Sequence, residues 1–367
     1  MLTSLIIIVL LICTIIQSYY WIKLFGPLAK YQDLPTNNTI DAPVSIIICA
    51  RNEAHNLQTF LPKILTQNYA EYEVIVVNDC SDDGTKQVLQ TLTEVYPHLR
   101  IVNLETKLTP GKKGALEEGI KAAKHDWLLL TDADCVPKSD LWINRMMTPT
   151  KDKKIKIVLG FSPYRYERGL LNLFIQYETF LTATQYLSYA LAGIPYMGVG
   201  RNLLYHRTLF EAAGGFQSHK NVTSGDDDLL ISKIATSHNT AISISSDSQT
   251  ISAPSNKYAI YYKQKRRHLS TGGLYKNQTK ILLSVFTLSH CFIYLCFVIY
   301  IVFKISTMFV PLLYVTRLIV LFPMTYSINK RLHTHTQMVW LPLLDLLLPM
   351  YIVFMSHALI LNSHRWK

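Results

Sequence analysis

Two carboxylates stand close together at the end of an apolar run, in a pattern that suits a metal ion. Asp132 and Asp134 follow residues 127–130, WLLL, with a single alanine between them. Alternate side chains of an extended chain point the same way, so both carboxylates can face one cavity and share a hard cation. Such a cation prefers oxygen ligands and leaves coordination positions open for a phosphate. The alternative is a solvent-exposed turn, but the position after a buried run favours the metal site.

Three consecutive aspartates, Asp226 to Asp228, form a second acidic group within the motif GDDDLL at 225–230. Adjacent carboxylates repel one another, and this repulsion can raise the pKa of one of them toward the range of a general base. The alternative is a helix that begins after Ser224 and Gly225, where acidic residues interact favourably with the helix dipole.

The segment from 43 to about 252 has the pattern of an α/β sheet that positions these groups. Short runs rich in Val, Ile and Leu suit strands that are covered on both faces. We expect strands at 44–50, 73–78, 100–104, 126–131 and 155–161. Between them, apolar residues recur at helical spacing, as at Leu57, Leu61 and Ile64. Alternating strands and helices predict right-handed crossover units and a mainly parallel sheet.

Polar residues cluster at the carboxyl ends of these strands, which is where ligands bind in such sheets. Residues 51–53, 79–85 and 132–134 follow the first, second and fourth expected strands. The sequence has no GxGxxG after a strand and no GxxxxGK[ST], so the dinucleotide fingerprint and the P-loop are both excluded. A ligand at this edge would therefore be held by carboxylates.

Apolar segments at both ends of the chain predict membrane helices. Residues 2–16 are followed by Tyr and Trp residues and by Lys23, as in a retained anchor rather than a cleaved signal peptide. Three further spans are expected at about 281–303, 305–328 and 338–361. Arg317 and Asp345 lie well inside these runs, and we expect them to pair across helices, because an unpaired charge at bilayer depth is costly.

The distribution of charge separates the two parts of the chain. The net charge is +11, but residues 1–256 carry 23 Lys and Arg against 24 Asp and Glu, whereas residues 257–367 carry 13 against 1. The excess of cations therefore belongs to the membrane part, which argues against binding to nucleic acid. Seven of the cations lie between 257 and 280, directly before an expected span, and this bias places the α/β domain in the cytoplasm.

Six cysteines without CxxC spacing indicate neither a disulfide framework nor a zinc site. Residues 169–194 contain one charge, Glu178, and five aromatic residues. Two readings of this segment remain open: a helix packed over the active site, or a helix that enters the membrane interface. Both place an acceptor near the bilayer.

Taken together and in this order, the motifs resemble those of family 2 glycosyltransferases, which have the GT-A fold. The resemblance rests on VSIIICARNE, VIVVNDCSDDGT, GKKGALEEG and LLLTDADC, and continues through residues 197–216, GDDDLL and QKRRH at 264–268. It covers residues 44–268. It implies a donor-binding half with a sugar bound through a nucleoside diphosphate, and a divalent metal, Mg²⁺ or Mn²⁺.

The resemblance also implies roles for residues on the donor side. Glu53 and Asp79 would hold the base or ribose, and Asp83 would support their loop, although Asp82, Asp83 and Gly84 also suit a plain turn. Lys112, at a helix start, would face a phosphate unless it is a solvated lysine. Asp134 would be the metal ligand, and Asp132 would contact the ribose or a water on the metal.

For the reaction itself, the resemblance makes Asp227 the base, with Asp226 as the alternative if the alignment shifts by one. Gln264 and Arg267 belong to a segment similar to QxxRW, in which Arg267 would hold the diphosphate. His268 stands where tryptophan is usual and would lie on the acceptor side, as would Asn202. The missing tryptophan argues against processive synthesis.

These inferences predict three parts of the chain: an N-terminal anchor at 1–22, a GT-A domain at 43–270 and C-terminal membrane helices at 281–361. The expected function is inverting, metal-dependent transfer of a sugar from a nucleotide donor to a lipid or lipid-linked acceptor, by an integral membrane protein of a bacterial cell membrane. The alternatives are a processive polysaccharide synthase and a non-catalytic nucleotide-binding transporter or scaffold.

Overall fold

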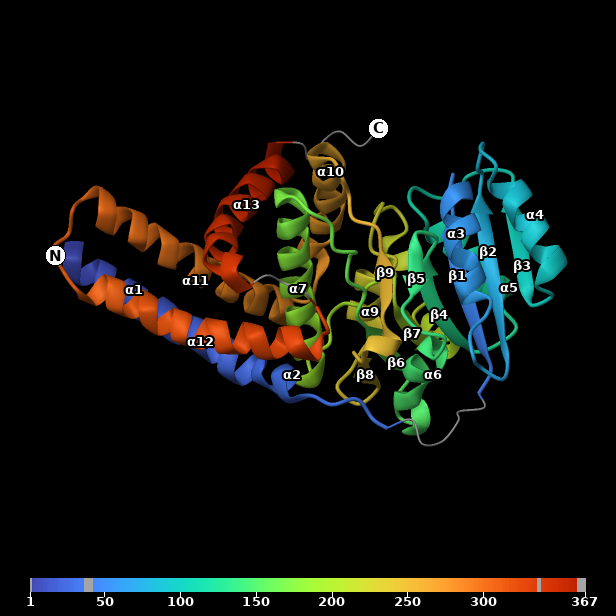
Figure 1. Cartoon of the computed structure of the whole chain (residues 1–367), viewed down its shortest axis with the longest axis horizontal. Coiled ribbons are helices and arrows are strands. Elements are labelled where there is room, and N and C mark those ends of the chain that lie inside the picture. The colour runs from blue at the N-terminus through green and yellow to red at the C-terminus, as the bar shows by residue number, and fades with distance from the viewer. Residues whose placement is uncertain (1, 36–41, 335–337, 362–367) are drawn as a thin grey trace.

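A computed structural model describes residues 2–35, 42–334 and 338–361, without the side chains of 358–361. It has an α/β domain at one end and a bundle of long helices at the other, with two helices, α7 and α10, between them (Figure 1). The two ends therefore correspond to the sheet and the membrane segments expected from the sequence.

The α/β domain is built on a seven-stranded sheet in the order β3-β2-β1-β4-β7-β6-β8. Its strands are β1 (Val44–Ala50), β2 (Tyr72–Asp79), β3 (Leu99–Leu104), β4 (Trp127–Asp132), β6 (Ile157–Gly160), β7 (Leu203–His206) and β8 (Thr240–Ser243). Strands β3, β2, β1 and β4 are parallel, and β7 is antiparallel to both of its neighbours. The prediction of a mainly parallel sheet is confirmed.

The register of the strands brings the polar segments to one edge. Ala50 of β1 pairs with Asn78 of β2, and Cys49 pairs with Asp132 of β4. The chain therefore leaves β1, β2 and β4 at almost the same level of the sheet. Each of the three acidic segments expected from the sequence begins there.

Helices cover both faces of the sheet, which explains the nearly continuous apolar character of its strands. Ile46 and Ile48 pack in the core shared with α3 (Ala54–Ile64), α4 (Thr85–Val95) and α6 (Trp142–Met147), whereas Ile47 packs with α5 (Lys113–Ala122). Helix α5 approaches the sheet at Gly119, where an added Cβ would lie 2.6 Å from a methyl carbon of Ile47. Only glycine allows this helix so close.

A small second sheet was not predicted. Strands β5 (Cys135–Pro137) and β9 (Thr250–Ser252) are antiparallel, with Cys135 opposite Ser252. This pairing joins the segment after β4 to a part of the chain more than one hundred residues away. Helices α8 (Arg207–Ala212) and α9 (Asp228–Ile234) complete the domain.

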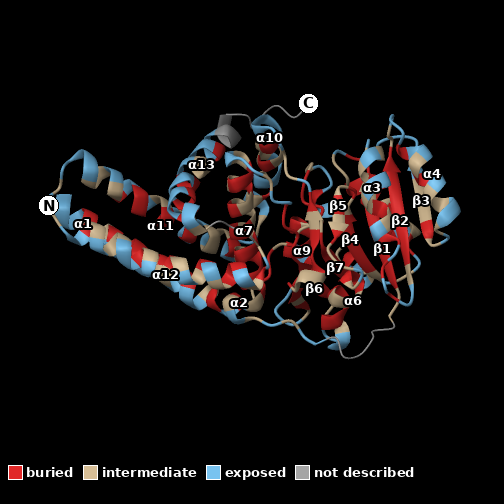
Figure 2. Ribbon diagram, in the orientation of Figure 1, coloured by how far each residue is buried: buried red, intermediate tan, exposed pale blue. Residues whose placement is uncertain are grey.

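Within the described residues, four segments are long and apolar enough to cross a membrane: Leu2–Lys30, Asn277–Val302, Phe309–Arg331 and Met338–His357. They contain helices α1 (Leu2–Tyr19), α2 (Gly26–Lys30), α11 (Asn277–Val302), α12 (Phe309–Arg331) and α13 (Leu341–Leu361). Helices α1, α11 and α12 lie side by side, and much of their outer surface is exposed (Figures 1 and 2). That exposed surface is rich in Leu, Ile, Val and Phe, as expected for contact with lipid.

The expected pairing between Arg317 and Asp345 is confirmed. Arg317 Nη1 lies 2.5 Å from Asp345 Oδ2, and Nη2 lies 3.0 Å from Oδ1, so the pair is bidentate. Tyr294 and Tyr177 donate further hydrogen bonds to the same carboxylate. Helices α7, α11, α12 and α13 therefore meet at one buried carboxylate.

Helices α7 (Leu170–Leu191) and α10 (Tyr258–Leu269) run across the direction of the long helices (Figure 1). Most of α7 is buried between the sheet and the bundle, where Tyr186 donates to the carbonyl of Gly160 at 2.7 Å. An ion pair joins Glu178 of α7 to Lys265 of α10. Of the two readings of residues 169–194, the structure matches a helix packed inside the protein.

Candidate active site

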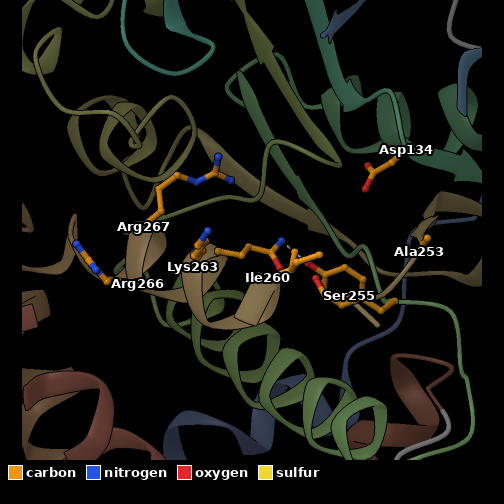
Figure 3. Close-up of a pocket in the computed structure, with 9 residues that line it drawn as sticks. Asp134, Ala253, Ser255, Ile260, Lys263, Arg266 and Arg267 are labelled. Atoms are coloured by element: carbon orange, nitrogen blue, oxygen red, sulfur yellow. Dashed lines mark hydrogen bonds between the residues drawn. The ribbon is translucent and has the colours of Figure 1, made fainter. Parts of the chain in front are cut away.

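A cavity of about 580 Å³ opens between α10 and the carboxyl edge of the sheet (Figure 3). Asp134 points into it from the sheet side, and Arg267 extends toward it from α10 (Figure 3). Three residues singled out in the sequence, Asp134, Gln264 and Arg267, therefore border one space. The other lining residues are Tyr164, Ala253, Ser255, Ile260, Lys263 and Arg266.

The two aspartates of the metal-binding motif have different surroundings. Asp132, at the end of β4, accepts a hydrogen bond from Lys112 Nζ at 2.8 Å. Asp134 accepts one from Ser252 Oγ at 2.9 Å, because the β5–β9 pairing places Ser252 beside it. One carboxylate is thus paired with a cation, whereas the other is hydrogen-bonded to a hydroxyl.

These surroundings shift the two pKa values in opposite directions. Burial alone would raise the pKa of Asp132, but the charge of Lys112 and its hydrogen bond bring it below the ordinary value. Burial, and then the negative charge of Asp132, raise the pKa of Asp134, and the Ser252 hydroxyl offsets only part of this. The pKa of Asp134 is raised even though the charge of Arg201 acts to lower it.

Lys112 lies at the centre of the acidic residues. Its ammonium is 2.8 Å from Asp132 and 3.1 Å from Asp226. Burial would lower the pKa of Lys112, but the charges of Asp132, Asp226 and Asp227 raise it well above the ordinary value. The lysine is therefore a permanent cation that joins the two acidic motifs, rather than a solvated surface residue.

Among the three consecutive aspartates, the middle one differs from its neighbours. Asp226 and Asp228 are buried, whereas Asp227 is only partly buried. Asp227 Oδ2 accepts a hydrogen bond of 2.7 Å from the backbone N–H of Gly200. Burial, followed by the charges of Asp226 and Asp228, raises the pKa of Asp227 to about 7.

Gly200 allows the loop before β7 to approach these groups. A Cβ at this position would lie 3.2 Å from Lys112 Nζ and 3.3 Å from Asp227 Oδ2. A side chain here would therefore crowd both. The same distances show that Lys112 and Asp227 both lie close to Gly200.

The segments after β1 and β2 form neighbouring loops at the same edge. Glu53 precedes α3 and accepts a hydrogen bond from Asn56 at 2.6 Å. Burial raises its pKa, and the nearby charges of Asp134 and Asp132 add to this rise. Asp79 is buried at the end of β2 and pairs with Lys107 at 3.1 Å. Asp83 accepts from the backbone of Ala54 and Thr85, so it stabilises the loop.

Helix α10 supplies the other side of the cavity. Gln264 donates to the hydroxyl of Tyr164 at 3.1 Å. His268 lies beside Arg267, with 3.5 Å between the nearest nitrogens. Loss of solvent, and then the charges of Lys265 and Arg267, hold the pKa of His268 well below its ordinary value. The imidazole is therefore neutral at physiological pH.

The placement of Asn202 on the acceptor side is wrong. Its side chain is fully buried, where it donates to the carbonyls of Phe161 and Ser248 and accepts from the Trp142 indole. Each of these bonds is internal to the protein, so the amide has no face toward a ligand. Asn202 instead holds β6, β7 and α6 together.

Three residues near the site were not identified from the sequence. Arg201 stacks on the Tyr164 ring at 4.2 Å, and its charge acts on both Asp132 and Asp134. Ser252 bonds to Asp134, and buried Lys113 donates to the carbonyls of Val222 and Ser224. All three contact residues that are distant in the sequence. The only sequence signal that could have identified any of them is that Arg201 and Lys113 lie within motifs already noted.

The acidic residues fit a divalent cation that a substrate would help to bind. The described part of the chain contains no cluster of three or more His, Cys, Asp or Glu side chains able to enclose a metal ion. Mg²⁺ and similar ions keep several waters and are held by one or two carboxylates together with substrate phosphates. Asp134, which borders the cavity and accepts a hydrogen bond from the Ser252 hydroxyl, matches that kind of ligand.

A mainly parallel sheet with carboxylates gathered at its carboxyl edge is the GT-A arrangement of glycosyltransferases. Residues 45–214 match the model of glycosyl transferase family 2.

Curated relatives agree with this assignment. The chain is 28% identical over 173 residues to poly-beta-1,6-N-acetyl-D-glucosamine synthase of Staphylococcus epidermidis, covering 44% of this chain and 41% of the relative. It is 31% identical over 128 residues to the glycosyltransferase AglE of Haloferax volcanii, covering 34% and 41% respectively. The matches thus span well under two thirds of the length of either relative.

A solved structure shares the fold over most of the chain. A mannosyltransferase from Pyrobaculum calidifontis, determined in complex with GDP-Man and Mn²⁺, superposes with a TM-score of 0.60. The likeness covers 90% of this chain and 97% of that one, at 19% identity. It therefore includes helices beyond the sheet.

Proposed function

We propose that this protein transfers a sugar, with inversion, from a nucleoside diphosphate donor to a lipid or lipid-linked acceptor at a membrane surface. The observation that carries the proposal is the position of Asp227. Asp227 is a partly exposed carboxylate with a pKa of about 7. Its neighbour Asp226 pairs with Lys112, and Lys112 also pairs with Asp132 at the acidic edge of the sheet.

On the donor side, Glu53 and Asp79 would hold the base and ribose of a nucleotide, with Asp83 supporting the loop through its hydrogen bonds to backbone N–H groups. Asp134 and Asp132 would hold Mg²⁺ or Mn²⁺, which when bound neutralises charge on the departing diphosphate. Arg267, with Gln264 beside it on α10, would bind the phosphate oxygens, because a guanidinium donates in a planar fork. Lys112 keeps Asp132 ionised for this role.

Asp227 would act as the general base. An acceptor hydroxyl becomes a better nucleophile when a neighbouring carboxylate accepts its proton as it attacks the anomeric carbon. A base with a pKa near the working pH is suited to this step, and Asp227 has such a pKa. Asp226 is the weaker candidate, because it is buried and paired with Lys112.

A membrane-bound acceptor is supported by the surroundings of the cavity. Its lining includes Lys263, Arg266 and Arg267 as well as Ile260, all on a helix that contacts membrane helix α13. Cations and apolar side chains together suit an acceptor with a polar head and a lipid chain. His268 would lie on this side.

We propose three functional parts, an anchor at 1–22, a catalytic domain at 43–270 and membrane helices at 281–361. The catalytic domain would lie on the cytoplasmic face of a bacterial membrane.

Processive polysaccharide synthesis is the second candidate. It is favoured by the Staphylococcus epidermidis relative, which is a polysaccharide synthase. His268 argues against it, because the position carries no tryptophan on which a growing polymer would stack. The length of the product distinguishes one added sugar from a chain.

The test is a screen of nucleotide sugars with the purified full-length protein, Mn²⁺ or Mg²⁺ and a membrane lipid extract. We expect one donor to release its nucleoside diphosphate and to label a lipid product. Asp227→Asn and Asp134→Ala should each lower transfer by at least about a hundredfold, the scale seen when one group acting on the transition state is removed. EDTA should abolish transfer.

Glu71→Gln is the matched control, because Glu71 is an exposed acid at the opposite edge of the sheet, directly before β2. It should transfer at the wild-type rate. Full activity in Asp227→Asn or in Asp134→Ala, with all variants folded, would contradict the proposal.

A further inference from the structure

The three consecutive aspartates hold three different parts of the protein. Asp226 pairs with Lys112 at the start of α5, and Asp227 accepts from Gly200 in the loop before β7. Asp228 turns the other way, toward the chain that connects α10 to α11. The proposed reaction involves Asp226 and Asp227 but assigns no role to Asp228.

Asp228 is bound by two hydroxyl groups of that connection. Its Oδ2 lies 2.5 Å from Thr271 Oγ1 and 2.6 Å from the Tyr275 hydroxyl, and its Oδ1 accepts from Leu229 N–H at 2.7 Å. Hydroxyl donors to an ionised carboxylate make short, strong hydrogen bonds of this length. Asp228 is 6% exposed and Thr271 is fully buried, so water does not compete for these bonds.

The connection bears directly on the cavity. Residues 270–276 follow α10, which carries Gln264 and Arg267, and precede membrane helix α11. The Thr271 hydroxyl also lies 2.8 Å from the carbonyl of His268, near the end of α10. Tyr275 packs edge-on against Tyr196 at 5.5 Å, on the sheet side. Movement of this connection would therefore move α10.

We propose that Asp228 is a positioning residue which, through Thr271 and Tyr275, fixes the α10–α11 connection against the loop that carries Asp227. The inference rests on the proposed function for its catalytic consequence. While these bonds hold, α10 closes one side of the cavity, and Arg267 and Asp227 keep a fixed relation. When they are broken, α10 is free to move with the membrane helices, and water reaches the cavity more easily.

The first test does not depend on any reaction. Hydrogen–deuterium exchange of residues 258–276 is measured in the full-length protein in lipid nanodiscs, for Asp228→Asn, Tyr275→Phe and Thr271→Val. Each change removes one partner of a buried charged hydrogen bond, so exchange should become on the order of tenfold faster. Thr271→Ser keeps the hydroxyl, and Tyr262→Phe keeps the ring that packs on Phe354 from α10, so both should exchange like the wild type.

The second test separates positioning from a general loss of folded protein. With the donor found in the screen, both sugar transfer to lipid and release of free sugar by hydrolysis are measured. In Tyr275→Phe and Thr271→Val the ratio of hydrolysis to transfer should rise on the order of tenfold. A smaller amount of folded enzyme would lower both rates together and leave the ratio unchanged.

Wild-type exchange in Tyr275→Phe and Thr271→Val would overturn the inference, whatever the enzyme does. Faster exchange with an unchanged ratio would overturn the catalytic role of the positioning. Faster exchange in a protein that uses no nucleotide sugar would overturn the proposed function and leave the structural link in place. If Asp228→Asn does not fold, the tyrosine and threonine variants decide.

Discussion

At the scale of single residues, the aspartates of the site differ in pKa because each has different neighbours. Asp132 is kept ionised by Lys112, whereas Asp134 accepts from the Ser252 hydroxyl and the weakly donating Cys135 thiol. Burial, and then the charges of the buried acids on both sides of it, raise the pKa of Asp227. Three carboxylates of one type thus acquire three chemical characters from their neighbours.

The pH dependence of transfer should report Asp227. The carboxylate must be ionised to accept a proton, and its pKa is raised to about 7, so the fraction in the active form falls as the pH drops below that value. We expect kcat to fall about tenfold per pH unit below pH ~7 and to level off above it. Rate measurements from pH 5.5 to 8.5 check this, and a kcat that stays level down to pH 5.5 would rule out Asp227 as the base.

The hydroxyl of Ser252 should matter for metal binding, although it is not an expected ligand. It orients Asp134 through a hydrogen bond of 2.9 Å. Partners of this kind typically contribute 10–100-fold to metal affinity, so Ser252→Ala should weaken Mn²⁺-dependent binding of UDP or GDP about tenfold. Calorimetric titration measures this. Ser237→Ala, an exposed serine in a distant turn, should bind as the wild type does.

The sequence predicted which residue types gather at this edge but not how they pair. Asp132, Asp134 and Asp227 were recognised because each follows an apolar strand or a glycine in a motif. Arg201 and Ser252 were missed, because their contacts depend on β7 and β9, short strands whose three or four residues carry no usable periodicity. Asn202 was misplaced for the same reason, since its burial depends on three segments that meet only after folding.

At the scale of elements, helix α5 connects the site to the core of the sheet. It begins directly after Lys112 and packs on Ile47 and Val77 through Gly119. The five strands expected from the sequence are all present, with bounds that differ by at most two residues at the amino ends and one at the carboxyl ends. Long apolar runs predict such strands well, whereas the antiparallel β7 could be placed only by its partners β4 and β6.

A methyl group at Gly119 should displace α5. The added Cβ would lie 2.6 Å from Ile47 and 3.0 Å from Val77, within a buried core that has little room to adjust. Overpacking of this kind costs about 1–3 kcal/mol, so Gly119→Ala should lower the unfolding temperature. Thermal unfolding of the purified protein checks this. Gly26→Ala, whose added carbon would make only ordinary contacts at 3.7 Å, should be nearly neutral.

At the scale of the whole molecule, the sheet and the membrane helices share one apolar core. The cluster that includes Ile47 and Leu116 continues through Tyr186 of α7 to Phe25 and Phe286 at the base of the bundle. The α/β domain is therefore packed onto the long apolar helices rather than tethered by a flexible linker. The sequence predicted both parts, but not this contact, because residues 169–194 suited two locations equally.

The buried ion pair should be essential to the bundle as a pair. Arg317→Met or Asp345→Leu alone leaves a charge without its partner among buried helices, which costs about 3–5 kcal/mol. The double variant should regain most of that loss, short of the hydrogen bonds from Tyr177 and Tyr294. Thermal unfolding of full-length protein in detergent compares the three. A double variant no more stable than the single ones would contradict this reading.

The same ion pair has a consequence for biosynthesis. Ribosomes make α12 before α13, so Arg317 reaches the lipid-insertion machinery 28 residues ahead of the aspartate that neutralises it. A lone arginine in the middle of an apolar segment opposes insertion by several kcal/mol. Helices α12 and α13 should therefore enter the bilayer together as a hairpin, and a chain that stops before α13 should leave α12 outside the membrane.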